Sequence, residues 1–99
     1  MHGNDAQVLV LTVLADGPLH GYAINAAIEG VTGEKLGPGS LYGALTRLEA
    51  RGLIEPAAEN GRQHSVRLTA AGRTRLRSEL ERMATLSRLG LRSLGVELA

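Results

Sequence analysis

The sequence predicts a mainly α-helical fold with one small β-hairpin. Apolar residues recur at intervals of three and four in several segments, which is the spacing of one buried helix face. The dipeptide Asn60-Gly61, which favours two-residue hairpin turns, lies after the third of these segments. A long helical pattern then continues from Thr69 towards the end of the chain. The expected order is therefore three helices, a hairpin and a long last helix.

The composition indicates one domain with an aliphatic core. The chain has 99 residues, of which 43% are hydrophobic, and it contains no Phe, Trp or Cys. The lack of cysteine excludes disulfides and thiolate-bound metal. Because no apolar run is long enough to span a bilayer and no secretory signal is visible, we expect a soluble cytoplasmic protein without membrane association.

The charge is unevenly distributed along the chain. The net charge is only +1, but residues 1–61 carry three basic and seven acidic side chains, whereas residues 62–99 carry eight arginines and three acids. Most of these arginines fit a solvated helix face. Arg62 and Arg67 are different, because they lie on the predicted hairpin.

The first helix is expected over residues 4–15, with Asn4 or Asp5 as its cap. The second is expected over residues 20–30, and its residue Tyr22 is expected to join it to its neighbours. Its buried stripe recurs at helical spacing and comprises Ile24, Ala27, Ile28 and Val31.

The third helix opens at Pro38-Gly39-Ser40 and ends near Arg51-Gly52. Leu41, Ala44, Leu45 and Leu48 form its buried stripe. A helix that needs only solubility more often carries Glu and Lys on its outer side, whereas small residues permit close approach to a large partner. The outer side of this helix is small and polar, with one arginine, and holds Gly39, Ser40, Gly43, Thr46, Arg47 and Ala50.

Two strands are expected at residues 53–58 and 63–68, with Leu53 opposite Leu68. Thr69 then caps a last helix of nearly thirty residues. Such a helix extends beyond a small domain, so its apolar stripe predicts a homodimer in which a second chain covers it. The stripe that we assign to dimerisation comprises Leu76, Leu80, Met83, Leu86, Leu91 and Leu94.

This order of elements is that of a winged helix-turn-helix over residues 1–68, followed by a dimerisation helix over residues 69–99. In such a fold the third helix enters the major groove of duplex DNA, and the hairpin tip touches the backbone or minor groove. The candidate DNA contacts are Ser40, Tyr42, Gly43, Thr46, Arg47, Arg62 and His64.

Each candidate contact also has a structural explanation. Arg47 can donate to both acceptors of a guanine, which discriminates against the wrong base by about 1–3 kcal/mol. Alternatively, it is a solvated arginine paired with a glutamate. Ser40 can bond a phosphate or cap the helix. The Tyr42 ring is expected to pack while its hydroxyl points to phosphate. His64 can reach DNA or be a strand residue half-covered by Ala57.

The chain resembles the PadR family of transcriptional regulators, in the short type with a single C-terminal helix. The resemblance covers residues 9 to 73, about two thirds of the chain. The matching stretches are Leu19-His20-Gly21-Tyr22, Pro38-Gly39-Ser40-Leu41-Tyr42, Ala44-Leu45, Arg47-Leu48-Glu49, Gly52-Leu53-Ile54, Arg67-Leu68-Thr69 and Ala71-Gly72.

The resemblance implies a homodimeric repressor that a small phenolic or drug-like effector releases from DNA. The chain departs from the family pattern at Gly43, where proline is usual, and at Ala70, where Glu is frequent. The wings of the family are typically rich in Arg and Lys and return through a pair of tyrosines. The corresponding stretch here, Arg62-Gln63-His64-Ser65-Val66, is less basic and lacks both tyrosines. The last helix also lacks the aromatic side chains that sandwich planar ligands in some members.

Two other classes of function agree less well with the sequence. A dimeric winged-helix module that binds proteins and has lost DNA binding is the main alternative, favoured by the low net charge and the thin wing. An enzyme is not expected, since no Ser–His–Asp set, carboxylate pair or phosphate-binding loop is visible. We expect no cofactor and no metal, because His2, His20 and His64 are scattered without ligand spacing.

Overall fold

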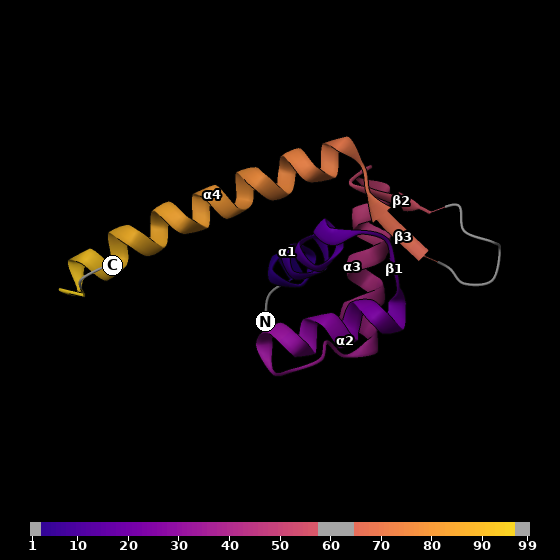
Figure 1. Ribbon diagram of the computed structural model, residues 1–99, viewed down its shortest axis with the longest axis horizontal. Coiled ribbons are helices and arrows are strands. Elements are labelled where there is room, and N and C mark those ends of the chain that lie inside the picture. Colours follow the sequence, from indigo (N-terminus) through magenta and orange to yellow (C-terminus); the bar gives the residue numbers. More distant parts are fainter. Residues whose placement is uncertain (1–2, 58–64, 97–99) are drawn as a thin grey trace.

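The computed structural model describes residues 3–57 and 65–96. Within these residues the chain is mainly α-helical and has one small antiparallel sheet, which confirms the predicted fold class (Figure 1). The elements in chain order are α1 (Gly3–Val13), a 3-10 turn η1 (Leu14–Asp16), β1 (Leu19–His20), α2 (Gly21–Thr32), α3 (Pro38–Ala50), β2 (Ile54–Pro56), β3 (Ser65–Leu68) and α4 (Ala70–Ser93).

The helices α1, α2 and α3 form the body of the molecule, with the sheet at one end (Figure 1). From the sheet, α4 runs back across α1 and continues beyond it, so that the molecule measures 52 × 27 × 23 Å. The core between these elements is aliphatic, as the composition predicts. Its most deeply buried side chains are Val10, Leu11, Leu14, Ile24, Ile28, Leu48 and Ile54.

The first two helices differ in detail from the sequence prediction. Helix α1 begins at Gly3, so Asn4 and Asp5 lie in its first turn and are not its cap. Residues Leu19–His20, which were not predicted as a strand, pair with β3. Val31 is 72% exposed and the prediction that it is buried is wrong, because the core contacts of α2 end with Ile28.

A hydrogen-bonded clip fixes the turn between α2 and α3. Gly33 ends α2 in the left-handed conformation, with a φ of 85°, and its N–H donates to the Glu29 carbonyl over 2.8 Å. The Asn25 side chain then bridges the turn. Its Nδ2 donates to the Leu36 carbonyl and its Oδ1 accepts from the Leu36 N–H, both over 2.8 Å. The start of α3 is thereby tied to the middle of α2.

The sheet has the strand order β1-β3-β2, and its register differs by one residue from the prediction. Leu68 pairs with Ile54 and not with Leu53. Paired residues share one face of a sheet, so this register places Ile54 and Leu68 together in the core. Leu53 has another role, since its carbonyl accepts from the Thr69 N–H over 3.1 Å. The predicted turn at Asn60-Gly61 lies outside the described residues.

Thr69 caps α4, as predicted. Its Oγ1 accepts from the Gly72 N–H over 3.0 Å and donates to the Gly52 carbonyl over 2.7 Å. The helix has 24 residues and ends at Ser93, so it is shorter than predicted. In the two described stretches of the chain, no helix is both long and apolar enough to cross a membrane.

Candidate nucleic-acid interface

Helix α3 turns one face to the core and the other to solvent. Leu41, Ala44 and Leu48 are buried. The opposite side is exposed at Ser40, Thr46 and Arg47, and Gly43 between them is half-buried. The residue at the cap position of α3 is Gly37, so Ser40 is not the cap and lies within the first turn. The outward face of α3 is therefore open, small and polar.

Arg47 carries the central positive charge of this face. Among the described residues it forms no ion pair, whereas Arg67, Arg75 and Arg82 do. Its guanidinium lies back over the preceding helical turn. Its Nη1 is 3.1 Å from the point where a Cβ on Gly43 would stand. The uncompensated charge is thus held close to the helix surface.

The two tyrosines of the chain lie at the junction of α3 and α2. Tyr42 is 58% exposed, and its hydroxyl is 3.4 Å from the Cβ position of Gly21 at the start of α2. Tyr22 is 76% exposed and its ring stacks on His20, with ring centroids 6.4 Å apart. Tyr22 thus contacts His20 while most of its ring faces solvent. Its position two residues before the buried Ile24 places it on the opposite side of α2.

A groove of about 530 Å³ connects these side chains to α3. It runs between the start of α2, the exposed side of α3 and the sheet. Three elements of the fold thus contribute to one continuous surface. The polar and aromatic groups along it are His20, Tyr22, Tyr42, Thr46 and Glu49.

Two of the predicted wing contacts, Arg62 and His64, lie outside the described residues. At the described base of the wing, the Arg67 Nε donates to the Glu55 carboxylate over 2.9 Å. These residues are directly opposite each other on β3 and β2. The charge of Arg67 is therefore paired within the sheet.

The stripe assigned to dimerisation divides into two parts. Leu76 is only 6% exposed and belongs to the core of this chain, so it holds α4 to the body and is not open to a second chain. Leu80, Met83, Leu86 and Leu94 are exposed, Leu94 by 80%. Leu91 is half-buried. The open part of the stripe thus begins at Leu80.

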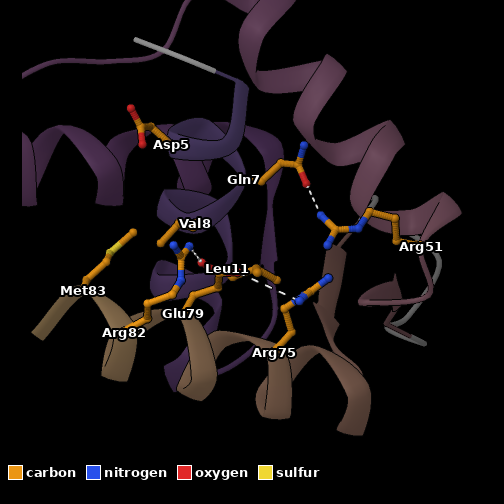
Figure 2. Close-up of a pocket in the computed structure, with 9 residues that line it drawn as sticks. All are labelled: Asp5, Gln7, Val8, Leu11, Arg51, Arg75, Glu79, Arg82 and Met83. Atoms are coloured by element: carbon orange, nitrogen blue, oxygen red, sulfur yellow. Dashed lines mark hydrogen bonds and ion pairs between the residues drawn. The ribbon is translucent and has the colours of Figure 1, made fainter. Parts of the chain in front are cut away.

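A cavity of about 440 Å³ lies between α1 and α4, and the sequence did not predict it (Figure 2). Its apolar wall is formed by Val8, Leu11 and Met83. Three guanidinium groups line the remainder together with Asp5, Gln7 and Glu79; they come from Arg51 just after α3 and from Arg75 and Arg82 on α4. These residues come from three elements that are far apart in sequence.

Hydrogen bonds hold the polar groups of this cavity (Figure 2). The Arg51 Nη1 donates to the Gln7 Oε1. The Arg82 Nη2 donates to the Glu79 carboxylate over 2.6 Å, and the Arg75 Nη1 lies 4.0 Å from the same carboxylate. The hydrogen bond from Arg82 lowers the pKa of Glu79 below its ordinary value of 4.5. Glu79 therefore stays ionised beside two arginines.

Comparison with known proteins gives the same fold and a family. The model of the PadR-like family of transcriptional regulators matches residues 10–78. An uncharacterized 37.1 kDa protein in transposon Tn4556 of Streptomyces fradiae is 66% identical over 87 residues, which is 88% of this chain. The chain spans only 25% of the length of that curated relative.

Solved structures resemble the chain along most of its length. RosR of H. salinarum is 34% identical, with a TM-score of 0.69 over 84% of this chain and 74% of RosR. Two others, at lower identity, share the fold. A transcriptional regulator from Clostridium thermocellum has a TM-score of 0.79 at 24% identity, over 90% of this chain and 89% of the other. A PadR-family regulator from Clostridium difficile has a TM-score of 0.78 at 23% identity, over 90% and 97%.

The family model covers more than half of the chain, and it spans α2, α3, the sheet and the first part of α4. The described geometry agrees with it, since three helices precede a small sheet and one long helix follows. The chain therefore belongs to the PadR-like family of transcriptional regulators, with a winged helix-turn-helix fold and a long C-terminal helix.

Proposed function

We propose that the chain is a homodimeric repressor that binds an inverted-repeat operator through α3 and responds to a small-molecule effector. The observation that carries this proposal is the outer face of α3, where Arg47 lies among small and polar residues and forms no ion pair within residues 3–57 and 65–96. The major groove of B-DNA is wide enough to admit a helix. A face without bulky side chains lets the helix approach the base edges closely.

The residues around Arg47 divide into base-reading and positioning groups. The guanidinium of Arg47 can donate to both acceptors of a guanine. Ser40 lies in the first turn of α3, where the helix dipole and free N–H groups favour a phosphate. The largely exposed Tyr42 and the side chain of Thr46 lie on the same groove, and their hydroxyl groups are suited to phosphate contacts. Such contacts would hold α3 in register on the duplex.

Tyr22 joins this set as a candidate that sequence reasoning missed. It is the second residue of α2, its ring is largely exposed, and it borders the same groove as Tyr42. The first helix of a helix-turn-helix crosses the DNA backbone when the second lies in the groove. A tyrosine at the start of α2 is therefore placed to donate its hydroxyl to a phosphate.

The open stripe of α4 supports the homodimer. Leu80, Met83, Leu86 and Leu94 leave an apolar surface on a helix that projects from the body (Figure 1). A second α4 offers the same surface, and a two-fold dimer buries both. Such a dimer carries two copies of α3, so its operator should be an inverted repeat. The half-site centres are expected about 34–36 Å apart, or a multiple of that distance.

The cavity of Figure 2 is the proposed effector site. Its guanidinium groups can bind a carboxylate, and Val8, Leu11 and Met83 can cover an apolar body. Sodium benzoate is a suitable probe, with neutral benzamide as the control. Benzoate should raise the thermal midpoint of the wild type more than that of Arg75→Gln, because a ligand stabilises the state that binds it. An equal rise with benzamide would remove this cavity from the proposal.

Selection of duplexes from a random library tests the DNA-binding proposal. Recovered sequences are expected to converge on an inverted repeat, and the bound protein should have the mass of two chains. If no sequence is enriched and no complex forms at low salt, the proposal fails. The dimeric protein-interaction module then becomes the better explanation, and partner proteins should be sought.

A further inference from the structure

We propose that Gly43 determines the DNA specificity of this chain, because the missing side chain at position 43 lets the Arg47 guanidinium lie over the preceding turn of α3. The position of that guanidinium sets which atoms of a base pair it can reach. This inference rests on the proposed DNA binding through α3 and adds a second residue to the reading of the base.

The geometry of the two residues carries the inference. Residues four apart are neighbours on a helix surface, and long helical side chains lean towards the N-terminus. The Arg47 Nη1 accordingly lies 3.1 Å from the point where a Cβ on Gly43 would stand. This distance is shorter than an ordinary van der Waals contact, so a side chain at position 43 would require the guanidinium to move by a few tenths of an ångström.

The helix backbone would not be displaced by such a substitution. Apart from the adjacent backbone of α3 itself, the only atom of the described residues within 4 Å of the Gly43 Cβ position is this Nη1, at the end of a flexible side chain. Gly43 also lies inside α3, where alanine favours the helix more than glycine does. Gly43→Ala is therefore expected to fold at least as stably as the wild type while moving Arg47. Stability and specificity can be separated at this position.

Gly39 extends the same smooth surface by one more turn. It lies four residues before Gly43, and beyond the adjacent helix backbone no atom of the described residues lies within 4 Å of its Cβ position. Gly39 and Gly43 thus leave two positions without a side chain on the outer face that Ser40 and Arg47 share. Gly39→Ala adds the same methyl group to this face without touching Arg47, and it serves as the matched control.

A displaced guanidinium changes specificity more than general affinity. The two hydrogen bonds from arginine to the N7 and O6 of guanine require the planar fork to be in register with both acceptors. Loss of this pairing corresponds to roughly a 5- to 140-fold loss in discrimination. Phosphate contacts elsewhere on the surface do not depend on the fork and should retain their salt-dependent binding.

A double-mutant cycle tests the inference on the highest-affinity duplex from the library selection. Wild type, Gly43→Ala, Arg47→Ala and the double variant are compared by anisotropy, with every single base-pair substitution of one half-site. Gly43→Ala should lower affinity roughly 5- to 140-fold. It should also change the preference at the base pair that Arg47 reads, and add no further loss once Arg47 is alanine. The change in affinity that Gly39→Ala causes should be the same whether residue 47 is arginine or alanine.

Circular dichroism melting checks that Gly43→Ala is folded. If the wild type binds but the loss from Gly43→Ala is equal in the presence and absence of Arg47, the inference is overturned and DNA binding stands. The same holds if Gly43→Ala leaves the base preference unchanged, or if Arg47→Ala binds as the wild type does. If the wild type binds no duplex, the proposed function and this inference fail together.

Discussion

The carbonyl oxygen of Leu53 lies 2.0 Å from the point where a Cβ on Gly72 would stand. Gly72 is buried in the first turn of α4, and Leu53 directly precedes β2. The same carbonyl accepts a hydrogen bond from the Thr69 N–H. The backbone of α4 therefore rests directly on the chain segment that leads from α3 into the sheet. This contact sets the direction in which α4 leaves the body.

Gly72→Ala is expected to destabilise the chain by about 1–3 kcal/mol or more, because its methyl group would overlap the Leu53 carbonyl and push α4 away. Chemical unfolding followed by circular dichroism measures the change. Gly30→Ala is the matched control, since Gly30 lies within α2 and, apart from the adjacent helix backbone, no atom in the described part of the chain lies within 4 Å of its Cβ position. The control should be as stable as the wild type or more so. Equal stability of the two variants would refute the role of the Leu53 contact.

Asn25→Ala is expected to loosen the turn that positions α3. The substitution leaves both the N–H and the carbonyl of the buried Leu36 without their partner, at a cost of about 1–3 kcal/mol in unfolding free energy. Asn25→Asp keeps the acceptor for the Leu36 N–H, so its unfolding free energy should differ from that of Asn25→Ala. Urea unfolding and hydrogen exchange at the Leu36 amide measure both variants. Unchanged exchange at Leu36 in Asn25→Ala would contradict the assignment of this clip.

The pKa of Glu79 is lowered chiefly by the hydrogen bond from Arg82, and less by the charge of Arg75. A carboxyl group whose pKa is lower in the folded chain stabilises the fold above the unfolded-state pKa, and this contribution is lost as the pH falls through the folded value. The difference in unfolding free energy between wild type and Glu79→Gln should therefore be complete above about pH 4.5 and disappear in more acid solution.

Titration by NMR separates the two arginines. Arg82→Ala should raise the pKa of Glu79 towards 4.5. Arg75→Ala should raise this pKa less, because Arg82 contributes more than Arg75 to lowering it. An unchanged pKa in Arg82→Ala would show that the 2.6 Å contact is not maintained in solution.

Leu86→Arg is expected to weaken the proposed homodimer, because it places a charge within the open apolar stripe of α4. Sedimentation velocity over a range of concentrations measures the fraction of dimer. Thr85→Arg adds the same charge to the neighbouring residue, which lies about 100° further round the helix, and should associate as the wild type does. Equal dimer fractions in all three proteins would show that the stripe is not the interface.

Local signals in the sequence were sufficient for much of the fold. Thr69 was recognised as a cap because its hydroxyl acts on an amide three residues away. The buried and exposed sides of α3 followed from helical spacing alone. The strand register could not be predicted from local signals. The Asn60-Gly61 signal favours one pairing, while burial of Ile54 with Leu68 favours another. Strand β1 was missed since two residues carry no periodicity.

The candidate sites were predicted only where one element supplies them. Arg47 and Thr46 lie on one helix, and their exposure follows from the stripe opposite them. Leu76 was misassigned because the spacing of leucines does not show where a helix leaves the core. The cavity of Figure 2 joins α1, α4 and Arg51, and no local pattern relates these elements. The roles of Arg62 and His64 stay predictions.

The measurement that tests the central claim most directly is fluorescence-anisotropy binding of the chain to random duplex DNA at several salt concentrations, with wild type and Arg47→Ala. The wild type should bind at low salt, its affinity should fall steeply as salt rises, and Arg47→Ala should bind more weakly. Absence of binding by both proteins at low salt would contradict DNA recognition through α3.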